Sequence, residues 1–106
     1  MLQRMPFPFP DDEFPAELGA VVQNTVLSGE RPAREVVHTP DGSWLVGDGV
    51  EDPDLPGACT VSHIGHVVER NSTVAGLASM PPGQWARRGG PGEPWIRYPL
   101  VDWDED

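Results

Sequence analysis

In Arg34-Glu35-Val36-Val37-His38-Thr39-Pro40-Asp41-Gly42-Ser43-Trp44-Leu45-Val46, two short runs rich in β-branched and aromatic residues flank a turn sequence. Valine and tryptophan favour extended backbone, and the Asp-Gly pair gives the turn the backbone freedom that it needs. This stretch predicts a β-hairpin with strands at 34–39 and 44–46. At least part of the chain is therefore expected to form a sheet.

The segment before the hairpin is predicted to be the main helix of the domain, from about Pro15 to Ser28. Its apolar residues recur at helical spacing. Pro15 suits the first turn of a helix, and Gly29 followed by Pro32 would end it. The apolar stripe consists of Phe14, Leu18, Val21, Val22, Thr25 and Val26.

The rest of the chain is predicted to combine short strands with short helices. We expect a third strand at 58–61, a helix after Ser62, a helical turn after Asn71, and a closing hairpin at 84–88 and 95–98. Strands and helices do not alternate strictly, which favours an α+β fold. The predicted architecture is a small antiparallel sheet of about five strands, packed by one main N-terminal helix and one or two short helices.

The 106 residues are predicted to form a single domain at 14–101, between an extended Pro/Phe arm at 1–13 and an acidic tail at 102–106. Apolar residues make up 38% of the chain, and the 13 Pro and 12 Gly indicate many turns. No stretch fits a signal peptide or a transmembrane helix, and the chain has one cysteine. We therefore expect a cytoplasmic protein that has no contact with a membrane.

Negative charge is concentrated in a few stretches. The net charge is −10, and eleven of the 17 acidic residues fall in three segments, at 11–13, 48–54 and 102–106. Clustered charge steers association with an oppositely charged partner more than it stabilises a fold. This pattern favours a protein-binding module that uses acidic patches against a basic protein. The candidate partner-binding residues are Asp48, Glu51, Asp52, Asp54, Trp103 and Asp104.

Direct binding of nucleic acid is not expected. Phosphate contacts require a basic surface, and only Arg87-Arg88, with Arg97, offers one. We interpret Arg87 and Arg88 as part of a solvated strand face. Catalysis has no support either, because no nucleophile motif surrounds a serine, and the glycine-rich run at 89–92 lacks the Lys and Ser or Thr of a phosphate-binding loop.

The three histidines and the single cysteine give a second hypothesis, a zinc site or a small metal-dependent enzyme. If residues 62–70 are helical, His63 and His66 share one face, and Cys59 lies just upstream. His38 on a neighbouring strand would complete a set of four zinc-competent ligands. Their spacing matches none of the established zinc signatures. The alternative interpretation is a cysteine that packs as a small apolar residue and histidines that bond to the backbone.

A string of motifs across residues 14–95 resembles small acidic hypothetical proteins of bacteria, especially of actinobacteria. The motifs are Val37-His38-x-x-Asp41-Gly42-x-Trp44, Gly65-His66-Val67-Val68-Glu69-Arg70, Leu77-Ala78-x-x-Pro81-x-Gly83, Ala86-x-Arg88 and Pro91-Gly92-x-Pro94-Trp95. The resemblance implies no activity and no catalytic residues. The size and acidity of that group are similar to those of bacterial immunity proteins, which occlude toxins, so that by analogy the basic partner would be a toxin. A third hypothesis is a structural domain or homodimer without a separable activity.

Overall fold

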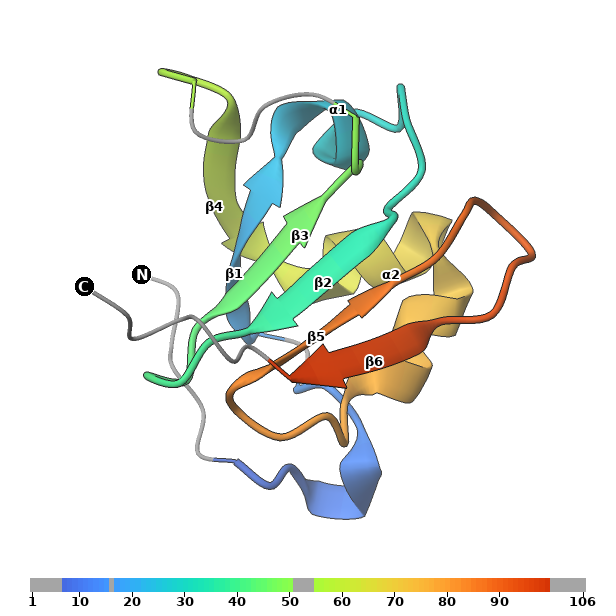
Figure 1. Ribbon diagram of the computed structural model, residues 1–106. Coiled ribbons are helices and arrows are strands. Elements are labelled where there is room, and N and C mark those ends of the chain that lie inside the picture. Colours follow the sequence, from blue (N-terminus) through green and yellow to red (C-terminus); the bar gives the residue numbers. More distant parts are fainter. Residues whose placement is uncertain (1–6, 16, 51–54, 100–106) are drawn as a thin grey trace.

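The computed structural model shows a six-stranded sheet with helices packed on one side (Figure 1). It describes residues 7–15, 17–50 and 55–99. The strands in this part of the chain lie in the order β4-β1-β3-β2-β5-β6. They are β1 (Gly19–Gln23), β2 (Glu35–His38), β3 (Trp44–Gly47), β4 (Cys59–His63), β5 (Gln84–Arg87) and β6 (Ile96–Pro99). The helical elements are the 3-10 helices η1 (Pro10–Asp12) and η2 (Ser72–Leu77) and the α-helices α1 (Asn24–Leu27) and α2 (Ile64–Arg70).

The predicted main helix at Pro15–Ser28 is wrong, because its centre is strand β1 and only α1 at its end is helical. The apolar residues of this segment fit both periods. Burial, however, alternates along the first part of the strand: Ala20 and Val22 are buried, and Val21 between them is only partly buried. A Val-Val pair fits a pleated strand between two neighbours better than a short surface helix. Pairing with β3 and β4 therefore overrides the helical spacing.

The predicted antiparallel sheet of about five strands is also wrong, because the sheet has six described strands and is mixed. β1 runs parallel to β3, whereas the other described pairings are antiparallel. The hairpins β2–β3 and β5–β6 are confirmed. The additional strand is β1, which lies between β3 and β4. It is the segment whose spacing indicated a helix.

One face of the sheet carries the hydrophobic core. Figure 1 shows α2 and η2 behind the sheet, where they contribute Ile64, Val67, Val74 and Leu77 to the buried cluster. The segment before β1 adds Phe9, which is 4% exposed. None of the described helices is long and apolar enough to cross a membrane. The core thus uses only one of the two faces of the sheet.

Candidate functional site

The opposite face of the sheet carries a line of apolar side chains that crosses all six described strands. Successive residues of a strand point to opposite faces, so the partners of these residues lie on the same side as they do. The strand register pairs each member with the next one across the sheet. We call this set the apolar row: Val61, Val21, Leu45, Val37, Trp85 and Tyr98.

No described helix covers the apolar row, since α2 and η2 lie on the far side of the sheet (Figure 1). None of its members belongs to the buried core cluster. Val61 is 62% exposed and Tyr98 42% exposed, and the four residues between them are half-buried. A sheet with one solvated face usually carries polar residues there. A continuous apolar row on that face is therefore typical of a binding surface.

A shallow hollow of about 210 Å³ lies in the middle of the apolar row. Val21, Leu45 and Val37 line it together with Glu35, Gly47 and Cys59. Gly47 contributes only backbone atoms to this lining, and a Cβ atom there would lie 3.2 Å from Gln23 Oε1. Such a hollow in an apolar surface can receive a side chain of a partner, as the central pockets of protein interfaces do.

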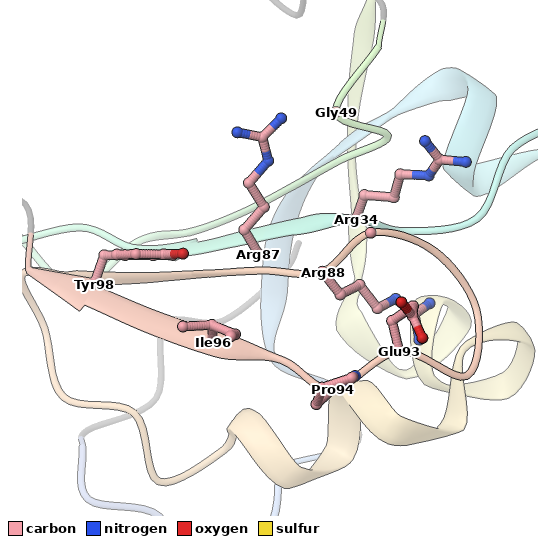
Figure 2. A pocket seen from close by; sticks show the side chains of 9 residues that line it. Arg34, Gly49, Arg87, Arg88, Glu93, Pro94, Ile96 and Tyr98 are labelled. Atoms are coloured by element: carbon pink, nitrogen blue, oxygen red, sulfur yellow. The ribbon is translucent and has the colours of Figure 1, made fainter.

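A second hollow, of about 400 Å³, adjoins the apolar row and shares Tyr98 with it. Its lining includes Arg34, Arg87, Gly49 and Ile96, and we call it the arginine pocket. Figure 2 shows the Arg34 and Arg87 side chains on the same side of the strands, flanking Gly49. Guanidinium groups recognise carboxylates and phosphates through paired N–H donors. The sign of the charge at this corner is therefore opposite to that of the whole protein.

The arginines around the pocket differ in how closely a carboxylate or another acceptor approaches their guanidinium groups. Arg87 Nε lies 3.8 Å from a carboxylate oxygen of Glu35, and the Arg87 side chain is 55% exposed, which makes this ion pair weak. Arg34 Nε is buried and has no hydrogen-bond partner among the described residues. Burial, and secondly the charge of Arg34, lower the pKa of Arg88. The charged residues that line the pocket are three arginines, Arg34, Arg87 and Arg88, and one carboxylate, Glu93, so positive charge is in local excess.

Arg88 is a structural residue, which corrects its interpretation as part of a solvated strand face. It is 6% exposed, and its guanidinium points away from Arg34 and Arg87 (Figure 2). It donates from Nε to the Ala33 carbonyl at 2.8 Å, from Nη1 to Thr73 Oγ1 at 3.0 Å and from Nη2 to Asn71 Oδ1 at 3.2 Å. It also lies over the ring of Trp95, 4.6 Å from the centroid.

Asp48, the first of the candidate partner-binding residues, is completely buried. Its Oδ2 accepts a hydrogen bond from Thr25 Oγ1 at 2.5 Å, and its Oδ1 accepts one from the Val50 N–H at 2.8 Å. Arg31 Nε lies 3.7 Å from the same carboxylate. Asp48 therefore joins the end of β3 to α1 and does not face a partner in this conformation. The remaining candidates, Glu51, Asp52, Asp54, Trp103 and Asp104, lie outside the described residues.

The structure separates the candidate metal ligands. Two strands, β1 and β3, lie between His38 on β2 and the pair Cys59 and His63 on β4, which makes three strand spacings, or about 14 Å. Its Nδ1 bonds to the Met80 carbonyl oxygen at 2.7 Å. His63 and His66 do lie together, with ring centroids 5.8 Å apart. Within the described residues, no group of three or more His, Cys, Asp or Glu could hold a metal ion.

Sequence reasoning missed the apolar row and the role of Arg34. One signal was present: Val36 and Val37 are consecutive apolar residues in a predicted strand, and they point to opposite faces. Apolar residues on both faces indicate a strand that is covered on both sides, by the same chain or by a partner. The row itself could not be recognised, because it includes Val21 of the strand that was predicted as a helix.

Comparisons with protein-family models, with curated proteins and with solved structures find no match to this chain. The resemblance to small acidic bacterial proteins stays a prediction.

Proposed function

We propose that this protein is a cytosolic protein-binding module that takes a basic protein partner on the uncovered face of its sheet. The observation that supports it is the apolar row, which spans six strands without a covering element among the described residues. An immunity-type or inhibitor-type protein would act in this way, by occluding the partner.

The composition of the apolar row suits an interface. Burial of apolar surface contributes roughly 25 cal/mol per Å², so exposed Val61 and Tyr98 gain by being covered. Trp85 and Tyr98 lie next to each other with ring centroids 5.1 Å apart. Tyrosine and tryptophan are the residues that most often dominate the binding energy of an interface. We expect these two rings to be the main anchors of the partner.

The charge of the chain favours a basic partner over a second copy of the protein. At a net charge of −10, two copies repel each other, whereas a basic protein is attracted and its association is accelerated. Salt weakens this attraction, because exposed charges are screened beyond about 10 Å at 0.1 M ionic strength. Binding is therefore expected to weaken as the salt concentration rises.

The test is capture of partners from native lysate with the tagged protein and with matched surface variants. Tyr98→Ser and Val61→Ser change exposed members of the apolar row, and Leu55→Ser changes a residue of similar exposure (58%) outside it. We expect a captured basic protein whose yield falls about ten-fold with Tyr98→Ser and is unchanged with Leu55→Ser.

Capture that is insensitive to both variants of the apolar row, or equally reduced by Leu55→Ser, would contradict the proposal. The proposal would also be contradicted if the captured protein were acidic, or if its binding did not depend on the salt concentration. Sedimentation of the purified protein separates the homodimer from a monomer, and a stable homodimer through the apolar row would also overturn the proposal.

A further inference from the structure

We propose that the arginine pocket is a binding site for a small organic anion, with a carboxylate or phosphate group held between Arg34 and Arg87 and an apolar group against Ile96 and Tyr98. This inference goes beyond the proposed function, because it concerns a ligand of the isolated protein and not its partner.

The first support is the concentration of positive charge in a strongly acidic chain. Arg34 and Arg87 point to the same side of the strands (Figure 2), and Arg88 is close enough for the charge of Arg34 to affect its pKa. Like charges repel at such distances, and an anion between them removes the repulsion. The pocket thus favours a negatively charged ligand before any hydrogen bond forms.

The second support is the buried Nε of Arg34. This atom has no hydrogen-bond partner among the described residues. Buried donors in native proteins nearly always have a partner, and a buried donor without one destabilises the fold. An oxygen of a carboxylate or phosphate is the acceptor that suits a guanidinium best. Nε itself is covered by protein atoms, so an oxyanion in the hollow would neutralise the Arg34 guanidinium through its terminal nitrogens.

The third support is the availability of Arg87. Its Nε lies 3.8 Å from the Glu35 carboxylate, beyond the length of a good hydrogen bond, and more than half of its side chain is exposed. A ligand can therefore engage Arg87 without breaking a strong interaction. Arg88 does not bind the ligand in this way, because its guanidinium is buried, points away from Arg34 and Arg87 (Figure 2) and donates to Ala33, Thr73 and Asn71.

The shape of the pocket limits the ligand. Gly49 lies beside Arg34, and a Cβ atom at this position would lie 3.2 Å from Arg34 Cβ. Ile96 is 51% exposed and Tyr98 42% exposed, so both offer apolar surface to a ligand. The hollow of about 400 Å³ is large enough for an aromatic acid and falls within the size range of small-molecule sites.

The test is titration of the full chain with four probes. Binding is followed in NMR spectra by the backbone amide signals of Gly49 and Gly89, which both line the pocket. Benzoate and phenyl phosphate carry the two head groups on one apolar body, inorganic phosphate carries a head group alone, and benzamide is neutral. We expect at least one aromatic anion to shift both signals and benzamide to leave them unchanged. Inorganic phosphate is expected to bind about ten-fold more weakly than phenyl phosphate, because it lacks the apolar group.

Matched variants decide whether the site is the arginine pocket. Arg34→Gln and Arg87→Gln each remove one charge-assisted contact and are expected to weaken binding about ten-fold or more. Arg70→Gln makes the same change in net charge outside the pocket and should alter the affinity less than about two-fold. Arg87 is exposed, so its variant tests the site even where Arg34→Gln fails to fold.

Two results would overturn the inference: no shift of the Gly49 and Gly89 signals with either aromatic anion, or an equal loss of affinity with Arg70→Gln. Equal binding of inorganic phosphate and phenyl phosphate would overturn the role of Ile96 and Tyr98. None of these results bears on partner capture, which Val61→Ser tests at a residue that does not line the arginine pocket.

Discussion

His38 and Trp44 stack face to face across the β2–β3 hairpin, with ring centroids 3.9 Å apart and ring planes inclined by 14°. Both side chains lie on the core face, and each is 1% exposed. The Met80 carbonyl can only accept a hydrogen bond, so the Nδ1 atom of His38 carries a proton and donates it. This arrangement holds a neutral imidazole inside the core.

We predict that the stability of the protein decreases as the pH falls below about 6.5, because of His38. Burial lowers the pKa of His38, and the hydrogen bond to Met80 opposes the effect in part. The unfolded chain takes up a proton near pH 6.5, whereas the folded protein does so only at lower pH. The contribution of neutral His38 to stability is therefore fully present above about pH 6.5 and is lost as the pH falls through the lowered pKa. Urea unfolding of the wild-type protein and of His38→Gln, above and below about pH 6.5, measures the contribution of His38 to the free energy of unfolding. An equal pH dependence in His38→Gln, or its loss in the exposed control His66→Gln, would show that another group is responsible.

We predict that Asp48→Asn destabilises the fold by about 2–4 kcal/mol, because the buried carboxylate accepts from Thr25 and Val50 and neutralises Arg31. Chemical denaturation measures this loss. The control is Glu69→Gln, whose side chain is 70% exposed and should change the free energy of unfolding by less than about 0.5 kcal/mol. A neutral effect of Asp48→Asn would mean that the carboxylate is not held inside the protein in solution.

We predict that Arg88→Lys costs about 2–4 kcal/mol of stability, although it keeps the charge. Lysine cannot reproduce three donors directed at Ala33, Thr73 and Asn71, and it loses the planar contact with Trp95. Arg87→Lys on the exposed face is expected to cost less than about 0.5 kcal/mol. Thermal or urea unfolding of the two variants compares neighbouring arginines directly. Equal losses would contradict the buried position of Arg88.

We predict that Gly49→Ala is more damaging than Gly57→Ala. Both glycines have positive φ angles (71° and 75°), so alanine costs about 1 kcal/mol at either position. Only Gly49 has a close neighbour, since its Cβ would lie 3.2 Å from Arg34 Cβ, whereas nothing lies within 4 Å at Gly57. Unfolding experiments measure the difference between the two variants, and a similar loss in both would mean that contact with Arg34 adds nothing.

Elements with contacts between nearby residues were predictable from local patterns. The turn of the first hairpin is an example: the Thr39 N–H donates to the Ser43 carbonyl at 2.8 Å, and the Ser43 N–H to Asp41 Oδ1 at 3.2 Å. These bonds depend on residues within five positions of one another, so the turn sequence is sufficient to indicate them. The helix after β4 and the closing hairpin were predictable for the same reason.

Strand β1 was not predictable in this way. Val21 and Val22 fit helical spacing and strand alternation equally, and the strand forms because β3 and β4 supply hydrogen-bonding partners on both sides. The same limit applies to the site. Arg87 and Arg88 are adjacent in the sequence, and only the position of β5 between β2 and β6 decides that Arg88 is the buried one.

The amino-acid sequence alone was sufficient for the net charge of −10, for the two hairpins and for a mixed α and β composition, because these depend on residue type and on neighbours along the chain. The arrangement in space determined the rest: the place of β1, the burial of Asp48, the distance between His38 and Cys59, and the uncovered apolar row. These properties arise from contacts between segments far apart in the sequence. Which side chains a segment exposes therefore depends on the strands that become its neighbours.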